Sequence, residues 1–250
     1  MTIATPPRRL AWQFATVVAA RDETPRARTL TLEVPDWPGH LPGQHLDVRL
    51  TAEDGYRAER SYSLASPTED PHLAITVERL VDGEVSPYLT DELLPGDRLE
   101  LRGPIGGHFT WTVADGGPLL LVAGGSGIVP LMAMLRHRAA AGSAVPTRLL
   151  YSSRSYDDIL YRDELAALAA DDAALMVIQT LTRVRPPGWT GHHGRIDVAL
   201  LEQVAWPPDE QPRMFVCGPT PLVEHVASAL VGLGHDPAHV KTERFGPTGG

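Results

Sequence analysis

The pattern of hydrophobic and polar positions changes about half-way along this chain. In the first half, apolar residues recur in short alternating runs bounded by proline, glycine or aspartate, which is typical of antiparallel strands. Predicted strands cover residues 14–19, 27–34, 45–51, 56–64, 73–80 and 98–102. Their spacing predicts an antiparallel β-barrel with one short helix at 86–94, in which Ser86 is expected to cap the helix and Pro87 to occupy its first turn.

The second half alternates continuous apolar runs of strand length with longer segments of helical period. We predict strands at residues 118–123, 147–152, 175–180 and 214–217, and helices at 130–141, 159–170, 197–204 and 220–233. A strand, a turn and a helix in repeated succession predict an α/β doubly wound parallel sheet. The turn-rich segment 113–118 separates the two patterns, so the expected domains span residues 8–113 and 117–250.

Composition and charge exclude several classes of protein. The chain has 250 residues and a formal net charge of −9, which argues against a nucleic-acid partner because such partners usually require a basic face. No apolar run approaches the roughly 18 residues of a membrane span. Residues 1–7 lack a signal-peptide pattern, so we expect a cytoplasmic protein that does not enter a membrane.

Cysteine and histidine usage limits the redox and metal chemistry. Cys217 is the only cysteine, which excludes an intramolecular disulfide and a cysteine-ligated iron–sulfur cluster within this chain. The histidines show no metal-ligand spacing, and the adjacent pair His192 and His193 is expected in a solvated loop. No metal site is predicted.

Two segments of the first half carry candidate phosphate-binding chemistry. The run Arg60-Ser61-Tyr62-Ser63 lies on a predicted strand, where an arginine fork suits a phosphate and an aromatic face can cover a flat ring. Taken alone, the run also fits a surface arginine beside strand hydroxyls. Further on, a turn at Gly83 precedes the predicted helix, whose N-terminus is a second place for phosphate.

Three segments of the second half lie where a strand ends. Gly125-x-Gly127-x-x-Pro130 follows an apolar strand and opens a helix, the context in which a glycine turn lets backbone approach a pyrophosphate. Ser152-Ser153-Arg154 ends the next strand, and Cys217-Gly218-Pro219 ends another. In such a sheet, ligands bind beyond the carboxyl ends of the strands.

Taken together and in this order, these motifs resemble the ferredoxin–NADP reductase superfamily, in particular bacterial members that lack a fused iron–sulfur domain. The resemblance runs from about residue 12 to residue 246. It implies that Arg60 pairs with a flavin phosphate, that Tyr62 packs on the isoalloxazine and that Ser63 bonds near its reactive N5. The further flavin contacts that we expect are Ser61, Thr76, Val77, Gly83, Val85 and Ser86. The Gly83 to Ser86 loop favours FAD, with FMN as the alternative.

The resemblance also assigns the nucleotide side of the site. Its glycine turn implies contacts from Gly125, Ser126, Gly127 and Pro130. Ser153 and Arg154 suit the 2′-phosphate of NADPH, with Arg183 as a second phosphate contact, whereas an acidic residue there would favour NADH. Arg183 also fits a solvated loop.

The nicotinamide end of the site is assigned by the same resemblance. Cys217, Gly218 and Pro219 are expected beside the nicotinamide, and Glu243 and Phe245 of the terminal strand beside the flavin. Ser63, Cys217, Glu243 and Phe245 are therefore the candidate catalytic residues. For Cys217 and Phe245, plain packing is the alternative.

The implied activity is hydride transfer from NADPH to FAD, followed by electron transfer to an acceptor. Because the chain stops at Gly250, where many relatives continue into a ferredoxin domain, we expect a separate acceptor: a ferredoxin or a partner redox enzyme. Two alternatives stay open. One is a reductase of small acceptors such as quinones or free flavins, and the other is a non-catalytic nucleotide-binding subunit of a larger redox complex.

Overall fold

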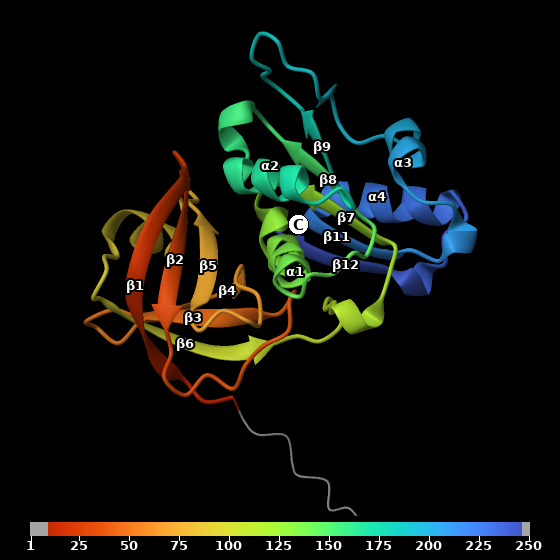
Figure 1. Ribbon diagram of the computed structural model, residues 1–250. Coiled ribbons are helices and arrows are strands. Elements are labelled where there is room, and N and C mark those ends of the chain that lie inside the picture. Colours follow the sequence, from red (N-terminus) through yellow and green to blue (C-terminus); the bar gives the residue numbers. More distant parts are fainter. Residues whose placement is uncertain (1–9, 247–250) are drawn as a thin grey trace, which may run out of the picture.

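A computed structural model describes residues 10–246 and shows two six-stranded sheets that follow one another along the chain (Figure 1). The first sheet is antiparallel, with strand order β4-β3-β6-β1-β2-β5, and confirms the predicted barrel. Its strands are β1 (Gln13–Thr24), β2 (Ala27–Glu33), β3 (His45–Thr51), β4 (Arg57–Ser63), β5 (Leu73–Glu78) and β6 (Arg98–Ile105). Residues 1–7, where no leader is predicted, and the predicted domain ends at 8–9 and 247–250 lie outside the described residues.

The barrel closes where its two edge strands meet. An isolated bridge joins Leu64, just after β4, to Ile75 of β5, and both side chains are fully buried in the barrel core. Apart from this bridge, the pairing of strand β4 among residues 10–246 is with β3.

The second sheet is parallel, with order β10-β9-β8-β7-β11-β12, and confirms the predicted doubly wound domain. Its strands are β7 (Leu119–Gly124), β8 (Thr147–Ser153), β9 (Leu175–Leu181), β10 (His192–His193), β11 (Arg213–Pro219) and β12 (Val240–Phe245). From β7 the chain adds β8, β9 and β10 in turn on one side, and it then adds β11 and β12 on the other side of β7. The direction of strand addition therefore reverses between β7 and β11. Such a switch point is where sheets of this kind bind ligands.

Alternation along the central strand places helices on both faces of this sheet (Figure 1). Leu119 and Leu121 pack in the same cluster as residues of α1 (Ile128–Ala140) and α2 (Arg162–Asp171). Leu120 and Val122 pack instead with α3 (Val198–Val204) and α4 (Thr220–Gly232). Because a strand side chain points to alternate faces, the apolar run of β7 is buried on both sides.

Three elements differ from the sequence predictions. The segment after the Gly83 turn forms a π-helix, Tyr88–Glu92, and the Ser86 side chain does not cap it; the predicted cap is wrong because the Ser86 hydroxyl accepts the Leu80 N–H at 3.0 Å. Helix α2 starts at Arg162, three residues later than predicted, because Tyr161 adopts a left-handed conformation with φ of 55°. The expected loop at His192 and His193 pairs with β9 as the short strand β10, while both side chains are exposed.

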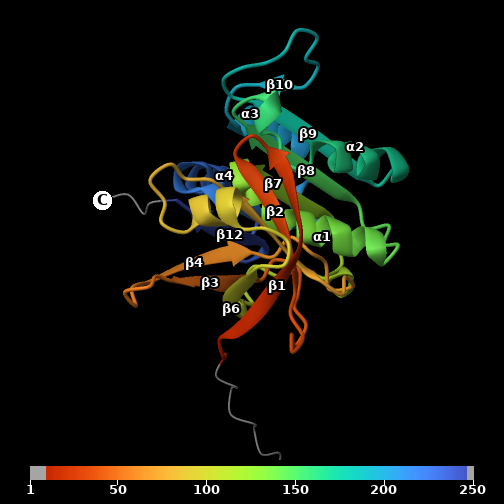
Figure 2. The same cartoon turned by 90° about the vertical axis from the view of Figure 1, so that its left-hand side faces the viewer.

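The two sheets are held together by polar contacts between distant residues. Tyr161 donates its hydroxyl to Thr76 Oγ1 of β5. Arg136 of α1 donates to the Ala65 carbonyl at 2.8 Å. Figure 2 shows the resulting arrangement, with the parallel-sheet part stacked above β3, β4 and β6.

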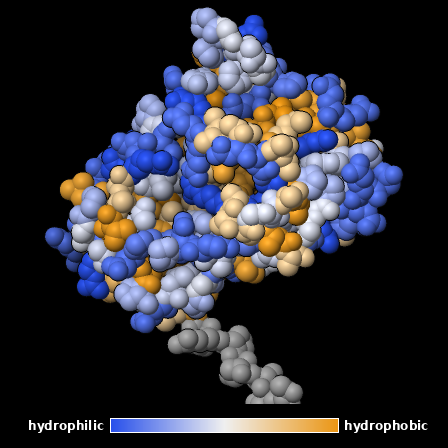
Figure 3. Space-filling model, in the orientation of Figure 1, coloured by the Kyte–Doolittle hydropathy of each residue, from blue (hydrophilic) through white to orange (hydrophobic). Residues whose placement is uncertain are grey.

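The surface and helix lengths give two further observations. On the face shown in Figure 3, hydrophobic residues lie in several separate groups with hydrophilic residues between them. Within residues 10–246, no helix combines the length and the apolar character that a bilayer crossing requires.

Candidate active site

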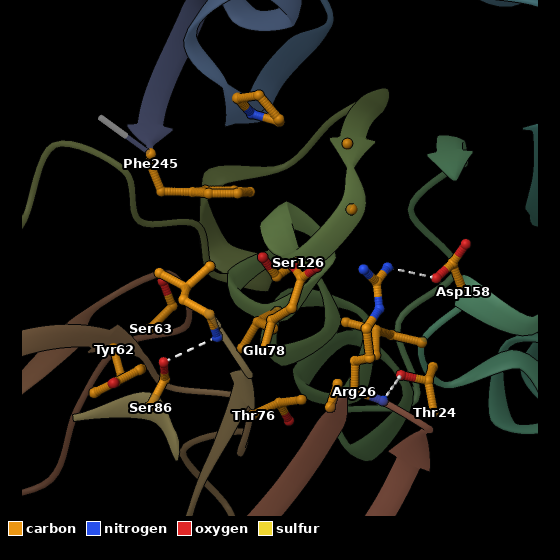
Figure 4. A pocket seen from close by; sticks show the side chains of 18 of the residues that line it. Thr24, Arg26, Tyr62, Ser63, Thr76, Glu78, Ser86, Ser126, Asp158 and Phe245 are labelled. Atoms are coloured by element: carbon orange, nitrogen blue, oxygen red, sulfur yellow. Dashed lines mark hydrogen bonds and ion pairs between the residues drawn. The ribbon is translucent and has the colours of Figure 1, made fainter. Parts of the chain in front are cut away.

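A cavity of about 750 Å³ lies between the barrel and the parallel sheet (Figure 4). Its size falls within the range of cofactor sites. One wall comes from β4, β5 and the loop before the π-helix, and the other from the carboxyl ends of β7, β8, β11 and β12. The predicted site residues that line it are Arg60, Ser61, Tyr62, Ser63, Thr76, Gly83, Val85, Ser86, Gly125, Ser126, Ser153, Arg154, Pro219 and Phe245.

The Arg60 side chain already holds a carboxylate in this cavity. Its Nη2 donates to Glu84 Oε2 at 2.7 Å, and the Tyr56 hydroxyl donates to the other oxygen of Glu84 at 2.8 Å. The Tyr56 hydrogen bond has the largest effect on the pKa of Glu84 and lowers it; desolvation opposes this effect, and Arg60 adds to the lowering, so this carboxylate stays charged. An anionic oxygen therefore stands at the position to which Arg60 points.

The rest of the β4 run is fixed by the strand beside it. The Ser61 hydroxyl donates to Asp47 of β3 at 2.7 Å, and Ser63 pairs opposite His45 in the ladder. Tyr62 packs against the barrel core, and burial raises its pKa to about 12, so the phenol remains protonated. The aromatic ring is thus anchored while one part of it faces the cavity.

The loop before the π-helix is built tightly around its serine. A Cβ at Gly83 would come within 2.7 Å of Ser86 Oγ, so no larger residue fits without moving the hydroxyl. Val85 is buried in the barrel core, and Ser86 is only 5% exposed. This loop is a narrow backbone turn at the cavity wall.

Strand β5 carries two predicted flavin contacts, Thr76 and Val77, and only the first of them lines the cavity. Thr76 lines the cavity, and its hydroxyl also bonds Thr29 at 2.7 Å. Val77, next along the strand, points into the barrel core and is fully buried, so its side chain is not part of the cavity wall.

The opposite wall begins where β7 runs into α1. Gly125 has φ of 55°, which favours glycine, and Gly125 and Ser126 line the cavity. Within the described residues, no side chain caps the N-terminus of helix α1. A Cβ on Gly127 would lie 2.2 Å from the Cys217 carbonyl, so this glycine permits close packing, while Pro130 is buried in the first turn of α1.

The end of β8 presents a serine and an arginine to the cavity. Ser153 is 5% exposed, and within residues 10–246 its Oγ atom has no hydrogen-bond partner. Arg154 is exposed, and its carbonyl accepts the Arg183 N–H at 2.9 Å. Arg183 is exposed as well, but it does not line the cavity.

Comparison with known proteins identifies this architecture. The family model described as "Oxidoreductase FAD-binding domain" matches residues 15–111, and that described as "Oxidoreductase NAD-binding domain" matches residues 121–228. The chain is 36% identical over 239 residues to ferredoxin–NADP reductase B of Sorangium cellulosum, covering 92% of this chain and 96% of that protein. The chain belongs to the ferredoxin–NADP reductase family.

Further relatives and solved structures are similar to this chain. The reductase subunit of glycine betaine monooxygenase from Pseudomonas aeruginosa is 35% identical over 211 residues, covering 83% of this chain. The chain spans only 56% of that relative's length. The structure of the Amycolatopsis cytochrome P450 reductase superposes with a TM-score of 0.83 at 28% identity, covering 95% of this chain and 71% of that one.

In this reductase-family chain, two predicted catalytic residues do not line the cavity. Cys217 and Glu243 are register partners on β11 and β12, two residues before the wall residues Pro219 and Phe245, which are also partners. Gly218 is buried between them and does not line the cavity either.

Burial controls the ionisation of this pair. It raises the pKa of the Cys217 thiol, with a smaller contribution from the neighbouring Glu243, so the thiol stays protonated. It also raises the pKa of Glu243 to about 7. Glu243 Oε2 is buried without a hydrogen-bond partner in the described part of the chain, and Oε1 lies 3.9 Å from His45 Nδ1.

The cavity also contains residues that no sequence motif indicated. They include Thr24 and Arg26 of the β1–β2 hairpin, Glu78 of β5, and Asp158, Leu160, Thr182 and Leu222 of the other wall. Arg26 Nη2 donates to Asp158 Oδ1 at 2.8 Å across the cavity (Figure 4). The pair joins residues 132 positions apart, so no local pattern could have revealed it.

Proposed function

We propose that this protein is an NADPH-dependent FAD reductase that passes electrons to a separate acceptor, a ferredoxin or a partner redox enzyme. Family membership supports an FAD-binding and an NAD-binding domain, which we place at residues 8–113 and 117–250. The observation that carries the proposal is one shared cavity, with the Arg60 to Ser63 strand on one wall and the Gly125 turn on the other.

The residues on the barrel wall fit a flavin dinucleotide. We assign the flavin phosphate to Arg60, which already bonds a carboxylate, because guanidinium and phosphate have matching geometry. Backbone at Gly83, Val85 and Ser86 lies beside that arginine and is assigned to the pyrophosphate. Tyr62 is assigned to the flat ring system, with Ser61, Thr76 and the backbone of Val77 as further contacts.

The opposite wall fits the pyridine nucleotide. The start of α1, at Gly125 to Gly127 and Pro130, is assigned to its pyrophosphate because the backbone N–H groups of the glycine turn and the helix dipole attract anions, while Pro130, which has no N–H, shapes the first helical turn. The unpartnered Ser153 hydroxyl and the exposed Arg154 are assigned to a 2′-phosphate, with Arg183 as an outer contact, which favours NADPH over NADH.

The cofactors supply the hydride and electron chemistry, and the chain supplies their geometry. We assign Ser63 as a hydrogen-bond donor toward the flavin, and Pro219 and Phe245 as the wall that orders the two rings. Cys217 and Gly218 leave room behind this wall, and Glu243 holds a proton there near neutral pH. In these roles the side chains exclude water from the two rings or hold the rings in a fixed orientation.

The acceptor is inferred from the names of the relatives. The Pseudomonas aeruginosa protein is a reductase subunit of a monooxygenase, and another relative, from Mycobacterium tuberculosis, is the ferredoxin reductase component of a 3-ketosteroid-9-alpha-monooxygenase. A separate acceptor protein of this kind is therefore the proposed partner.

The proposal is tested by the bound cofactor and by turnover with a one-electron acceptor. Heat-released cofactor should co-migrate with FAD and not with FMN. NADPH should drive ferricyanide reduction faster than NADH does, and Ser63→Ala should slow it by about tenfold, the scale of one lost hydrogen bond. Ser228→Ala, an exposed serine of α4, is the control. Equal rates for both variants would refute the role of Ser63, and absence of FAD would refute the proposal.

A further inference from the structure

We propose that the ion pair between Arg26 and Asp158 sets the preference between phosphorylated and unphosphorylated nucleotides. Arg26 comes from the flavin-binding half and Asp158 from the nucleotide-binding half. Arg26 neutralises a carboxylate that otherwise repels a 2′-phosphate and favours free ribose hydroxyls. This inference rests on the proposed function, because it takes the nucleotide to lie along the β8 wall.

Both side chains are held at the cavity wall. Arg26 Nη2 lies 2.8 Å from Asp158 Oδ1, and both residues line the cavity together with Thr24 (Figure 4). Two hydrogen bonds of the Arg26 backbone fix the hairpin that carries this arginine. The Arg26 N–H donates to Thr24 Oγ1 at 3.3 Å, and the Arg26 carbonyl accepts the Arg79 N–H at 2.8 Å. The Arg26 side chain is 49% exposed, so a ligand can reach its remaining donors.

Asp158 lies close to the assigned 2′-phosphate contacts. It follows Arg154 by four positions, in the short helix Tyr156–Asp158 just beyond the carboxyl end of β8. Partial burial raises the pKa of Asp158, but the Ser155 hydroxyl, Arg26 and Arg154 outweigh this effect and lower it. The carboxylate is therefore charged at neutral pH, in the field of Arg154.

A carboxylate after a sheet strand is the usual receptor for ribose hydroxyls, and it is unfavourable beside a phosphate. In this chain both oxygens of Asp158 are already engaged: Oδ1 accepts from Arg26, and Oδ2 accepts from Ser155 at 2.6 Å. Arg26 thus converts an acidic position into a neutral pair, and its remaining N–H donors can bond a phosphate beside Arg154. Removing Arg26 restores the acidic position.

The test compares two ligands that differ only in the 2′-phosphate, namely 2′,5′-ADP and 5′-AMP. Each is titrated calorimetrically into the flavin-loaded protein, so the readout does not depend on turnover. Arg26→Ala should weaken 2′,5′-ADP binding by about tenfold, the scale of one charge-assisted hydrogen bond, and change 5′-AMP binding less than about twofold. Asp158→Asn in the Arg26→Ala background should restore part of the lost affinity.

The matched control is Arg21→Ala, which removes an arginine of the same hairpin that pairs with Glu23 and lies outside the cavity. It should leave both affinities unchanged. Equal losses for the two ligands in Arg26→Ala, or no loss for either, would overturn the inference. Loss of bound flavin from Arg26→Ala, with the affinities for 2′,5′-ADP and 5′-AMP intact, would also overturn the inference, because Arg26 would then serve the flavin.

Failure of the inference is distinguishable from failure of the proposed function. If wild-type protein binds 2′,5′-ADP and Arg154→Ala abolishes this while Arg26→Ala does not alter it, only the inference fails. If wild-type protein binds neither ligand, the assignment of this wall to the nucleotide fails, and the inference fails with it.

Discussion

The guanidinium of Arg60 donates to the carboxylate of Glu84 at 2.7 Å, on the loop that the sequence assigns to a phosphate. The arginine that we assign to a flavin phosphate is thereby kept in place by an anion of the protein itself. Both side chains are about half exposed, so the pair is weak enough for a phosphate to displace it.

Replacement of Arg60 should therefore weaken flavin binding. We expect Arg60→Ala to raise the dissociation constant of FAD by about tenfold or more, because a charge-assisted hydrogen bond to phosphate is lost. Glu84→Gln should bind FAD at least as tightly as wild type, since the competing anion is removed. Flavin fluorescence quenching on titration of apoprotein measures both. The control is Arg57→Ala, an exposed arginine of the same strand, and an unchanged affinity in Arg60→Ala would contradict the assignment.

Arg154 should distinguish the two pyridine nucleotides. We expect Arg154→Ala to raise the KM for NADPH by about tenfold or more. The KM for NADH should change little, because NADH has no 2′-phosphate for Arg154 to contact. Arg183→Ala, whose arginine lies outside the cavity wall, should have a smaller effect. Steady-state kinetics with both nucleotides provide the measurement, and parallel losses for NADPH and NADH would reject the role of Arg154.

Glu243 should make stability depend on pH. Burial raises its pKa to about 7 in the folded protein from an ordinary 4.5, so the unfolded chain releases this proton first as the pH rises. Folding stability should fall between about pH 4.5 and pH 7 and level off above. The difference in free energy of unfolding between Glu243→Gln and wild type should shift in favour of the variant by on the order of 2 to 3 kcal/mol between pH 4.5 and pH 8. Urea unfolding at the two pH values measures this gain, and a difference independent of pH would rule out the raised pKa.

The contact between Tyr161 and Thr76 should contribute to cohesion between the two halves. The Tyr161 hydroxyl is buried and donates across the interface, and burial raises the phenol pKa, so the proton is retained. We expect Tyr161→Phe to lower the free energy of unfolding by about 1 kcal/mol, the net value of a buried hydrogen bond. Tyr156→Phe, at an exposed tyrosine of the same region, is the control. Equal stability of the two variants would show that the contact contributes nothing.

The sequence predicted the fold well because its signals are local. The change from alternating runs to continuous apolar runs correctly separated the antiparallel sheet from the parallel one, and every predicted strand is present. The errors concern local contacts and backbone conformation. Ser86 was expected to cap a helix but instead bonds Leu80, and α2 begins three residues late, after Tyr161, which adopts a left-handed conformation.

The site was predictable in part for the same reason. Arg60, Tyr62 and Gly125 belong to short motifs and line the cavity. Arg26 and Asp158 belong to no motif and meet only because the two halves pack together. Cys217 and Glu243 were each assigned to a strand, but that these two strands are adjacent and that neither residue lines the cavity depends on packing that a pattern does not show.

We propose that one cavity brings a pyridine nucleotide and a flavin together for hydride transfer. The most direct test is the visible absorption spectrum of the purified protein during anaerobic addition of NADPH. We predict a flavin band that loses its absorbance as NADPH is added, with NADH less effective at equal concentration. A flavin band that dithionite reduces and NADPH leaves unchanged would contradict the account.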